Sequence, residues 1–218
     1  MQSKLLNNDD ARKVLHKLIE SYPDAHYYLN FKTDLDLMVA AIISAQTRDE
    51  VVNSVTPALF KRYKTINDYA DSNEKELAVY IRKVSFSGNK AKNIIKTCKA
   101  VMDTHGGKIP KSMKDLTALP GIGRKTANTI LINAYGIVEG IPVDTWVIKL
   151  SGRIGLSKSN NPEDIEQDLM QILERRYWKT IAYVLKSHGK AICQSQIPIC
   201  SICMINKLCP RNGVTSSR

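Results

Sequence analysis

The sequence predicts an all-α protein, and two features lead to that fold class. Apolar residues recur at the three- and four-residue spacing of amphipathic helices along most of the 218 residues. No stretch competes through the strict alternation of apolar and polar residues that a half-buried β-strand requires. The length allows one large domain or two small ones, and the apolar fraction of 43% is ordinary for a folded protein.

The expected helices follow one another along the whole chain. Asp9 or Asp10 can cap the first helix, which carries an apolar stripe. Asp34 leads into the string LDLMVAAIISAQ, which is apolar on nearly every side and predicts a helix buried all round. Asp49 can cap the next helix, in which Pro57 predicts a kink or a break. Further helices are expected at about residues 73–84, 89–104, 111–119, 147–154, 162–177 and 180–188.

The net charge of +11 bears on function because it is clustered. Residues 78–102 and residues 175–218 contain no carboxylate. The first stretch carries Arg82, Lys83, Lys90, Lys92, Lys96 and Lys99. Basic stretches of this kind suit a polyanion, most simply a nucleic acid, and the alternative is a well-solvated surface without a partner.

No targeting segment is visible in the sequence. No segment approaches the ~18 consecutive apolar residues that would span a bilayer. The N-terminal string MQSKLLNNDDARK has no apolar core followed by a small-residue cleavage site. We therefore expect a protein without membrane association, located in the cytoplasm and on the nucleoid in a prokaryote.

Four of the five cysteines lie in one short C-terminal segment. They are Cys193, Cys200, Cys203 and Cys209, separated by six, two and five residues. Without a secretory signal, a metal centre is a better explanation than disulfides. The segment is compact enough for all four sulfur atoms to ligate one centre, and spacing alone leaves both a zinc ion and an iron–sulfur cluster open. Cys98 is expected to be a structural thiol within a helix.

A glycine-rich turn lies between two of the expected helices, at Pro120-Gly121-Ile122-Gly123. Glycine allows positive φ angles and the close approach of another backbone. The second helix starts near Arg124, and its first N–H groups point outward with the positive end of the helix dipole. The turn therefore predicts an anion site suited to a phosphate, and a simple helix connection is the alternative.

Lys125 and Asp144 are the candidate catalytic residues. Lys125 lies in the first turn of its helix, where the dipole disfavours a cation and should lower the pKa of the ammonium. A free amine is a nucleophile that can form a Schiff base with a sugar carbon, whereas a charged lysine would only contact phosphate. Asp144 precedes a helical run, so it can be an N-cap and also remain ionised to stabilise a cationic sugar or deprotonate a lysine.

Two strings and one cysteine spacing carry a resemblance to a known family. LPGIGRKTA resembles the helix–hairpin–helix motif of DNA-repair glycosylases, and Val143-Asp144-Thr145 is similar to the endonuclease III family. The cysteine spacing is that of this family's [4Fe–4S] loop, and the resemblance runs nearly end to end. It implies the helix–hairpin–helix DNA glycosylase fold, with two helical domains and a cleft between them. Residues 27–137 would form a six-helix domain, and residues 1–26 with 138–218 the iron–sulfur cluster domain.

The resemblance also implies an activity in base-excision repair. Lys125 matches the family's Schiff-base lysine, Asp144 its catalytic aspartate, and the four cysteines its [4Fe–4S] ligands, with zinc as the alternative. Lys125 would attack C1′ of a flipped, damaged nucleotide and displace the base, and β-elimination would then cut the strand 3′ to the abasic site. The implied substrates are oxidised pyrimidines in double-stranded DNA, or an abasic site itself, and we expect a monomer.

Seven residues are assigned to DNA contact by the same resemblance. These are Gln46, Phe86, Gly121, Ile122, Gly123, Arg124 and Thr126. Gln46 would enter the gap left by the flipped base, and Phe86 would be the apolar wedge that unstacks the duplex. A polar helix terminus and a packed loop aromatic are the respective alternatives.

Two departures from the family pattern affect substrate contact. Trp146 stands where relatives usually have His, beside Asp144, which puts the substrate preference in doubt. The loop between Cys193 and Cys200 has no Lys or Arg. DNA contacts in this region would therefore depend on Lys190, Lys207 and Arg211, which lie outside the loop.

Two alternative functions remain open at the level of sequence. One is a mismatch glycosylase that removes T or U opposite G, or A opposite a damaged G. Relatives with those activities often lack the lysine, so Lys125 favours lyase chemistry. The other is a non-catalytic helix–hairpin–helix DNA-binding protein, which would need neither Lys125 nor Asp144 at this spacing.

Overall fold

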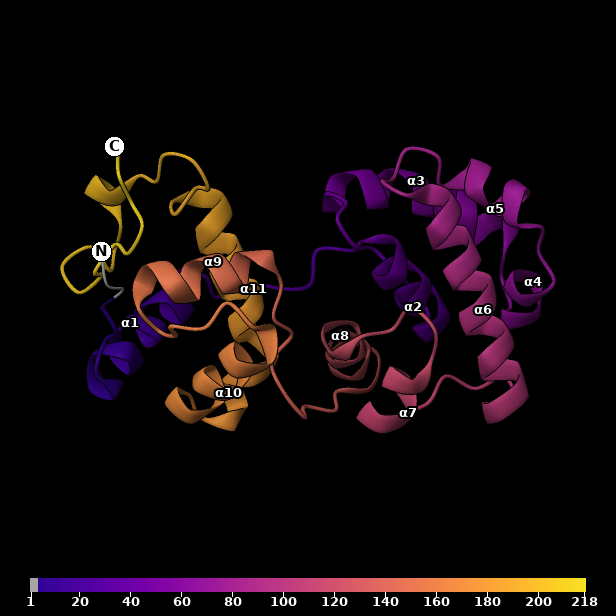
Figure 1. Cartoon of the computed structure of the whole chain (residues 1–218), viewed down its shortest axis with the longest axis horizontal. Helices are drawn as coiled ribbons and strands as arrows, with labels where there is room; N and C mark the ends of the chain where they lie inside the picture. Colours follow the sequence, from indigo (N-terminus) through magenta and orange to yellow (C-terminus); the bar gives the residue numbers. More distant parts are fainter. Residues whose placement is uncertain (1–3) are drawn as a thin grey trace. The chain divides into compact units, whose positions relative to one another are not determined.

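The protein is helical throughout the residues that its computed structural model describes, which are residues 4–218 (Figure 1). The predicted all-α class is confirmed. The α-helices are α1 Asn8–Ser21, α2 Asp34–Ile43, α3 Asp49–Arg62, α4 Ile66–Ala70, α5 Glu74–Tyr80, α6 Ser87–His105, α7 Met113–Ala118, α8 Arg124–Tyr135, α9 Thr145–Ile154, α10 Pro162–Ile172 and α11 Trp178–Ala191. Two short 3₁₀ helices are η1 Arg175–Tyr177 and η2 Cys200–Ile202. No described helix is long and apolar enough to cross a membrane.

The chain folds into two compact units. One consists of the N-terminal segment up to Tyr27 together with Gly140–Arg218, and the other is Tyr28–Glu139. Each unit has its own set of packed helices. The hairpin around Gly121 lies in the continuous unit, and the cysteine segment lies in the unit made of both ends of the chain.

The continuous unit is built around α2 and α6. From Leu37 to Ile43 every side chain of α2 is buried, as the apolar string predicts. This helix packs against α3, α6 and α8, and its N-terminus has a capping box between Thr33 and Asp36. The long helix α6 runs alongside α4 and α5 (Figure 1). The other helices of the unit therefore surround α2, its most apolar helix. Because α8 packs directly on α2, the position of α8 is fixed by this core.

The other unit buries the apolar stripe of α1. Val14, Leu15 and Leu18 are fully buried in a core that α9, α10 and α11 complete. The helix pairs α1 with α11, α1 with α10, and α9 with α11 make the contacts. Helix α9 is thus fixed on its apolar side, which determines where its first residues lie.

The structure corrects the expected caps of two helices. Asn7, and neither Asp9 nor Asp10, caps α1, because the Asn7 side chain accepts a hydrogen bond from the Asp10 amide at 2.8 Å. The two aspartates lie inside the first turn, where their charge suits the helix dipole. Asp49 is likewise the first residue of α3 and not its cap, since the preceding Arg48 holds that position without a side-chain bond.

The expected break at Pro57 does not occur. Helix α3 continues through Pro57 to Arg62. Buried residues on both sides of the proline, Val55 and Leu59 among them, anchor the helix in the core. Tertiary packing therefore outweighs the local cost of the missing amide hydrogen bond.

Other boundaries differ from the expected ranges by a few residues. The helix expected at 73–84 ends at Tyr80, and the one expected at 162–177 is divided into α10 and η1. The short helix α4 was not expected at all. Its capping box between Thr65 and Asp68 is a local pattern from which it could have been predicted.

Candidate functional site

The glycine-rich turn connects α7 and α8 as a tight hairpin. Leu116, Leu119 and Ile122 are buried, so their side chains hold the two helices together. Gly121 has a φ of +78°, and a Cβ atom there would lie 3.2 Å from the Cβ of Asn93. Both the backbone conformation and the nearby α6 therefore favour glycine at this position.

A threonine on α6 fixes the hairpin turn in place. The hydroxyl of Thr97, which is fully buried, donates to the carbonyl oxygen of Pro120 and is also 2.7 Å from the carbonyl oxygen of Asn93. The turn is thereby joined to a helix outside the hairpin. The sequence offered no pattern for this contact, because a threonine within a helix is ordinarily a neutral choice.

The N-terminus of α8 has the features of an anion site. Gly123 is its N-cap and supplies no side chain to accept from the first amides, and the first turn contains no acidic residue. Arg124, Lys125 and Thr126 follow directly and are partly exposed. Ile122 is buried, so only its backbone can take part in contacts outside the protein. The positive end of the helix dipole and two cations thus occupy one helix end.

Asp144 caps α9, as the sequence indicated. Its Oδ1 atom accepts hydrogen bonds from the amides of Trp146 at 2.8 Å and Val147 at 2.9 Å. Both bonds go to the same oxygen, and within the described part of the chain Oδ2 receives no hydrogen bond. The cap therefore fixes the carboxylate and leaves one of its oxygens for another group. Asp144 belongs to the two-segment unit, and Lys125 belongs to the continuous one.

Trp146, the unusual neighbour of Asp144, packs against a glycine of α11. A Cβ atom on Gly189 would lie 2.3 Å from Cε3 of the indole, far inside van der Waals contact. The ammonium of Lys149 lies 5.5 Å from the centroid of the same ring, within cation–π range. The ring is therefore held from two sides, which defines the surface next to Asp144.

Gln46 and Phe86 both have left-handed backbone conformations. Gln46 has a φ of +52° and Phe86 a φ of +57°. Gln46 is exposed in the turn after α2, and Phe86 is 64% exposed directly before α6. An exposed aromatic side chain argues against the alternative of a packed loop residue. Strained conformations of non-glycine residues concentrate at functional sites, where the surrounding structure maintains them.

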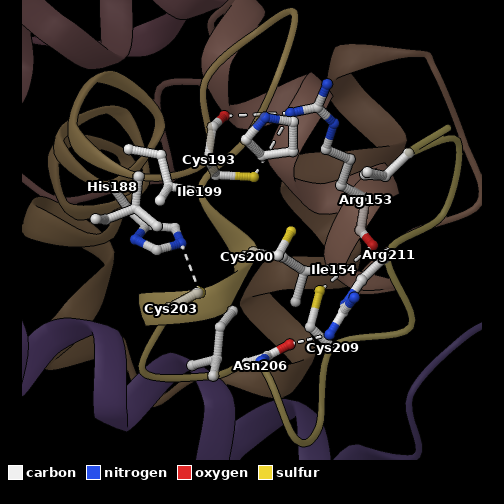
Figure 2. A pocket seen from close by; sticks show the side chains of 14 residues that line it. Arg153, Ile154, His188, Cys193, Ile199, Cys200, Cys203, Asn206, Cys209 and Arg211 are labelled. Atoms are coloured by element: carbon white, nitrogen blue, oxygen red, sulfur yellow. Dashed lines mark hydrogen bonds between the residues drawn. The ribbon is translucent and has the colours of Figure 1, made fainter. Parts of the chain in front are cut away.

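The four C-terminal cysteines line one cavity (Figure 2). All four are free thiols, and burial raises the pKa of Cys193 and Cys203 and raises that of Cys209 to about 11. Among residues 4–218, no group of three or more His, Cys, Asp or Glu side chains is placed to hold a metal ion. The donor set is nevertheless purely sulfur, which suits soft, thiophilic centres.

Arg153, at the end of α9, holds the loop after the first cysteine. Its guanidinium donates to the carbonyl oxygens of Cys193 at 3.2 Å, Gln194 at 2.7 Å and Ser195 at 2.8 Å. Lys149, one turn earlier, donates to the Ser195 hydroxyl at 2.6 Å. The loop without basic residues therefore has two cations from another helix beside it. Sequence analysis missed both, although their i, i+4 spacing on one helix was visible.

His188 has a structural environment. It is buried between Tyr22, whose hydroxyl is 3.1 Å from Nδ1, and Cys203, whose sulfur is 3.6 Å from Nε2. Burial lowers the pKa of His188 to about 4, so the ring is neutral at pH 7. It thus connects α1, α11 and the cysteine segment without carrying charge.

Comparisons with known proteins agree with this arrangement. Residues 39–175 match the model of the HhH-GPD superfamily of base excision DNA repair proteins. The chain is 42% identical over 200 residues to an endonuclease III from Synechocystis, covering 92% of this chain and 91% of the relative. A solved endonuclease III, trapped as a covalent intermediate with DNA, superposes with a TM-score of 0.92 at 34% identity, over 95% of this chain and 97% of that one.

A more distant structure shares only the fold. A thermostable thymine-DNA glycosylase matches with a TM-score of 0.83 at 18% identity, over 94% of this chain and 97% of that one. The fold therefore does not by itself select the damaged base, and side chains near the site must do so.

Proposed function

Because this chain belongs to the endonuclease III family of HhH-GPD base excision DNA repair proteins, we propose a specific role for each of its site residues. The protein is a DNA glycosylase with abasic-site lyase activity, and its partner is double-stranded DNA. The observation that carries the residue assignment is the position of Lys125. It is the second residue of α8, in a chain whose fold matches an endonuclease III trapped covalently on DNA.

The hairpin binds the DNA backbone. The amides of Gly123 and Arg124 and the side chain of Thr126 would surround a phosphate at the N-terminus of α8. Phosphate contacts of this kind set the register of the protein on the duplex but carry no information about the base. Thr97 and the buried Leu119 and Ile122 hold the turn for this purpose.

Lys125 is the nucleophile of the reaction. Its amine attacks C1′ of an extruded nucleotide, and the bond from C1′ to the base breaks. The base leaves with the bonding electron pair and takes up a proton. Ring opening at O4′ then gives the Schiff base. Removal of a proton from C2′ expels the 3′ phosphate by β-elimination, which cuts the strand. Hydrolysis of the imine returns the free lysine.

Asp144 supports this sequence of steps electrostatically. Its carboxylate can accept the proton that Lys125 must lose and can stabilise the positive charge that develops on the sugar. The α9 cap uses Oδ1, which leaves Oδ2 for this task. While the nucleotide is extruded, Gln46 fills the gap that it leaves and Phe86 acts as the wedge that unstacks the duplex.

Oxidised pyrimidines are the proposed substrates. Trp146 and Gly189 form the surface beside Asp144, and they are the residues through which this chain could differ from relatives with His at position 146. The runner-up is excision of a mismatched base, as in glycosylases of the same fold. Lys125 favours the first assignment because mismatch excision with water as the nucleophile does not need an amine.

The four cysteines are proposed to hold a [4Fe–4S] cluster. A tetrahedral zinc ion would gather the sulfur atoms at about 2.3 Å from one point, whereas a cluster holds them farther apart. Four thiols that line one cavity form an all-sulfur donor set, which is the set that holds a [4Fe–4S] cluster. The cluster would join the C-terminal segment to α9 and α11 and take no part in the chemistry on DNA. Stoichiometric iron with a broad visible absorption would distinguish it from zinc.

Borohydride trapping on a duplex with an abasic site tests the assignment of Lys125. The wild-type protein should form a covalent adduct, Lys125→Ala none, and Lys61→Ala the same amount as wild type. Lys61 is an exposed lysine of the same unit and serves as the matched control. Absence of an adduct with the wild-type protein would remove the lyase activity, and an adduct with Lys125→Ala would assign the nucleophile to another amine.

A further inference from the structure

Two turns of the continuous unit present side chains in strained conformations. In the described chain only three non-glycine residues have positive φ angles, which are Gln46, Phe86 and Arg211. A bulky residue such as phenylalanine adopts this region at a cost in energy, so something in the surroundings must hold it there. The side chains of Gln46 and Phe86 are exposed, so packing of these side chains does not hold the backbone in this conformation.

Lys90 contacts the turn that contains Gln46 from the inside. Its ammonium donates to the carbonyl oxygen of Ala45 at 2.6 Å and to the hydroxyl of Thr47 at 2.8 Å. These are the residues on either side of Gln46. One side chain thus fixes both ends of the strained peptide segment and leaves the glutamine side chain pointing out of this contact.

The backbone of Lys90 joins the second turn. Its amide donates to the carbonyl oxygen of Phe86 at 3.0 Å, which is the first hydrogen bond of α6. Phe86 is the N-cap of that helix and has no side chain that could form a capping bond. The same residue therefore holds the carbonyl of Phe86 with its backbone and the neighbours of Gln46 with its side chain.

The burial of Lys90 corrects the interpretation of its basic stretch. The residue is only 5% exposed, whereas Lys92, Lys96 and Lys99 on the same helix are exposed. A buried ammonium must be hydrogen-bonded to be tolerated, and within residues 4–218 this one makes no ion pair. Burial lowers the pKa of Lys90 to about 8. An apolar residue would fill this space without that cost, which points to a use for the donors.

We propose that Lys90 is a positioning residue that holds Gln46 and Phe86 in the conformations with which they enter the DNA. The inference rests on the proposed function, because it assumes that these two side chains probe the duplex. Lys90 itself does not touch DNA. It acts by keeping the two turns at a fixed separation, so that the filling of the gap and the unstacking of the duplex occur together.

The proposal predicts a difference between two activities of the same protein. Excision of a damaged base requires extrusion of a stacked nucleotide, which depends on Gln46 and Phe86. Cleavage at an existing abasic site needs much less unstacking, since the base is already absent. Loss of the Lys90 ammonium should therefore slow base excision by about 10- to 100-fold, the range expected for a displaced positioning group, and slow abasic-site trapping by less than about threefold.

Lys90→Met and Lys92→Met are the variants to compare. Methionine keeps an unbranched side chain of similar length at position 90 but donates no hydrogen bond. Lys92→Met removes one charge from the exposed face of the same helix and should leave the ratio of the two rates unchanged. Single-turnover excision of an oxidised pyrimidine and borohydride trapping on an abasic duplex give the two rates. Hydrogen exchange at residues 44–48, which the ammonium holds, should increase only in Lys90→Met.

Thr47→Val provides a second variant that retains the lysine. It removes one of the two acceptors of the ammonium. It should lower excision in the same direction as Lys90→Met but less, and it should have no further effect in the Lys90→Met background. If Lys90→Met does not fold, the excision rate of Thr47→Val decides, and a wild-type rate overturns the proposal.

Two results with folded Lys90→Met would overturn the inference. One is a wild-type rate of excision, and the other is an equal loss of both activities, which a general structural role would produce. A wild-type protein that neither excises a base nor traps an adduct would instead remove the proposed function itself. The two failures are therefore distinguishable.

Discussion

The indole ring of Trp146 lies directly on the backbone of Gly189, at a distance that leaves no room for a side chain. A Cβ atom on Gly189 would be 2.3 Å from Cε3 and 2.7 Å from Cζ3 of the ring. Both of these contacts are with ring carbon atoms, and the ammonium of Lys149 lies over the same ring. The ring therefore cannot move aside without losing these packing contacts. This pair is therefore one of the contacts that join α11 to the start of α9.

Gly189→Ala should destabilise the protein by about 1–3 kcal/mol, the usual cost of overpacking, despite the better helix propensity of alanine. Urea unfolding measures the change. Gly152→Ala is the matched control, because a Cβ there would meet nothing within 4 Å and the substitution should stabilise α9 slightly. A Trp146→His background should remove much of the penalty, and simple additivity of the two substitutions would contradict the contact.

Asp144→Asn should separate the cap from the catalytic role. Asparagine caps a helix about as well as aspartate, so the free energy of unfolding should change little. The negative charge is lost, and single-turnover excision should fall by at least about 100-fold if the charge stabilises the transition state. Asp144→Ala should lose activity and about 0.5–2 kcal/mol of stability as well. Full activity of Asp144→Asn would show that only the cap matters.

The stability of the protein should depend on pH through Lys90. The pKa of its ammonium is lowered to about 8 in the folded state, while the unfolded state keeps the ordinary value of 10.5. Between these values the unfolded chain binds more protons, so stability rises with pH through this window and this contribution is lowest below pH 8. The difference in unfolding free energy between wild type and Lys90→Met, followed from pH 7 to pH 10, isolates the effect. A difference independent of pH would contradict it.

Replacement of a cysteine in the C-terminal segment should remove the proposed cluster. Cys203→Ala should lose the visible absorption and the bound iron, and its melting temperature should fall because metal binding contributes to folding. Cys98→Ala is the control, since Cys98 is buried in α6 within the other unit. It should keep its iron while losing some stability to a cavity. Equal iron content in the two variants would exclude the assigned ligands.

Periodicity in the sequence was sufficient to predict the helical class and the buried helix α2. An unbroken run of apolar residues such as Leu37–Ile43 has few alternatives once strands are excluded. The hairpin and the cap by Asp144 were equally visible, because local rules decide both. Of the kink or break expected at Pro57, the break does not occur, since the effect of a proline depends on the tertiary packing that surrounds α3.

Sequence patterns could not reveal the contacts made across the fold. Lys90 was counted with the basic surface because its neighbours in the sequence are lysines, and only the packing of α6 places its ammonium beside Ala45. Arg153 and Thr97 likewise act on loops that are distant in sequence. Caps, turns and ligand spacings are local patterns, whereas a hydrogen bond between remote segments has no local pattern.

Gly189 also makes positions 146 and 189 dependent on each other in any redesign of this chain. A tryptophan at position 146 is compatible with glycine at position 189, whereas even a methyl group there collides with the ring. A larger residue on α11 at position 189 therefore needs a smaller side chain at position 146. The surface beside Asp144 can be varied only by changing the two positions together.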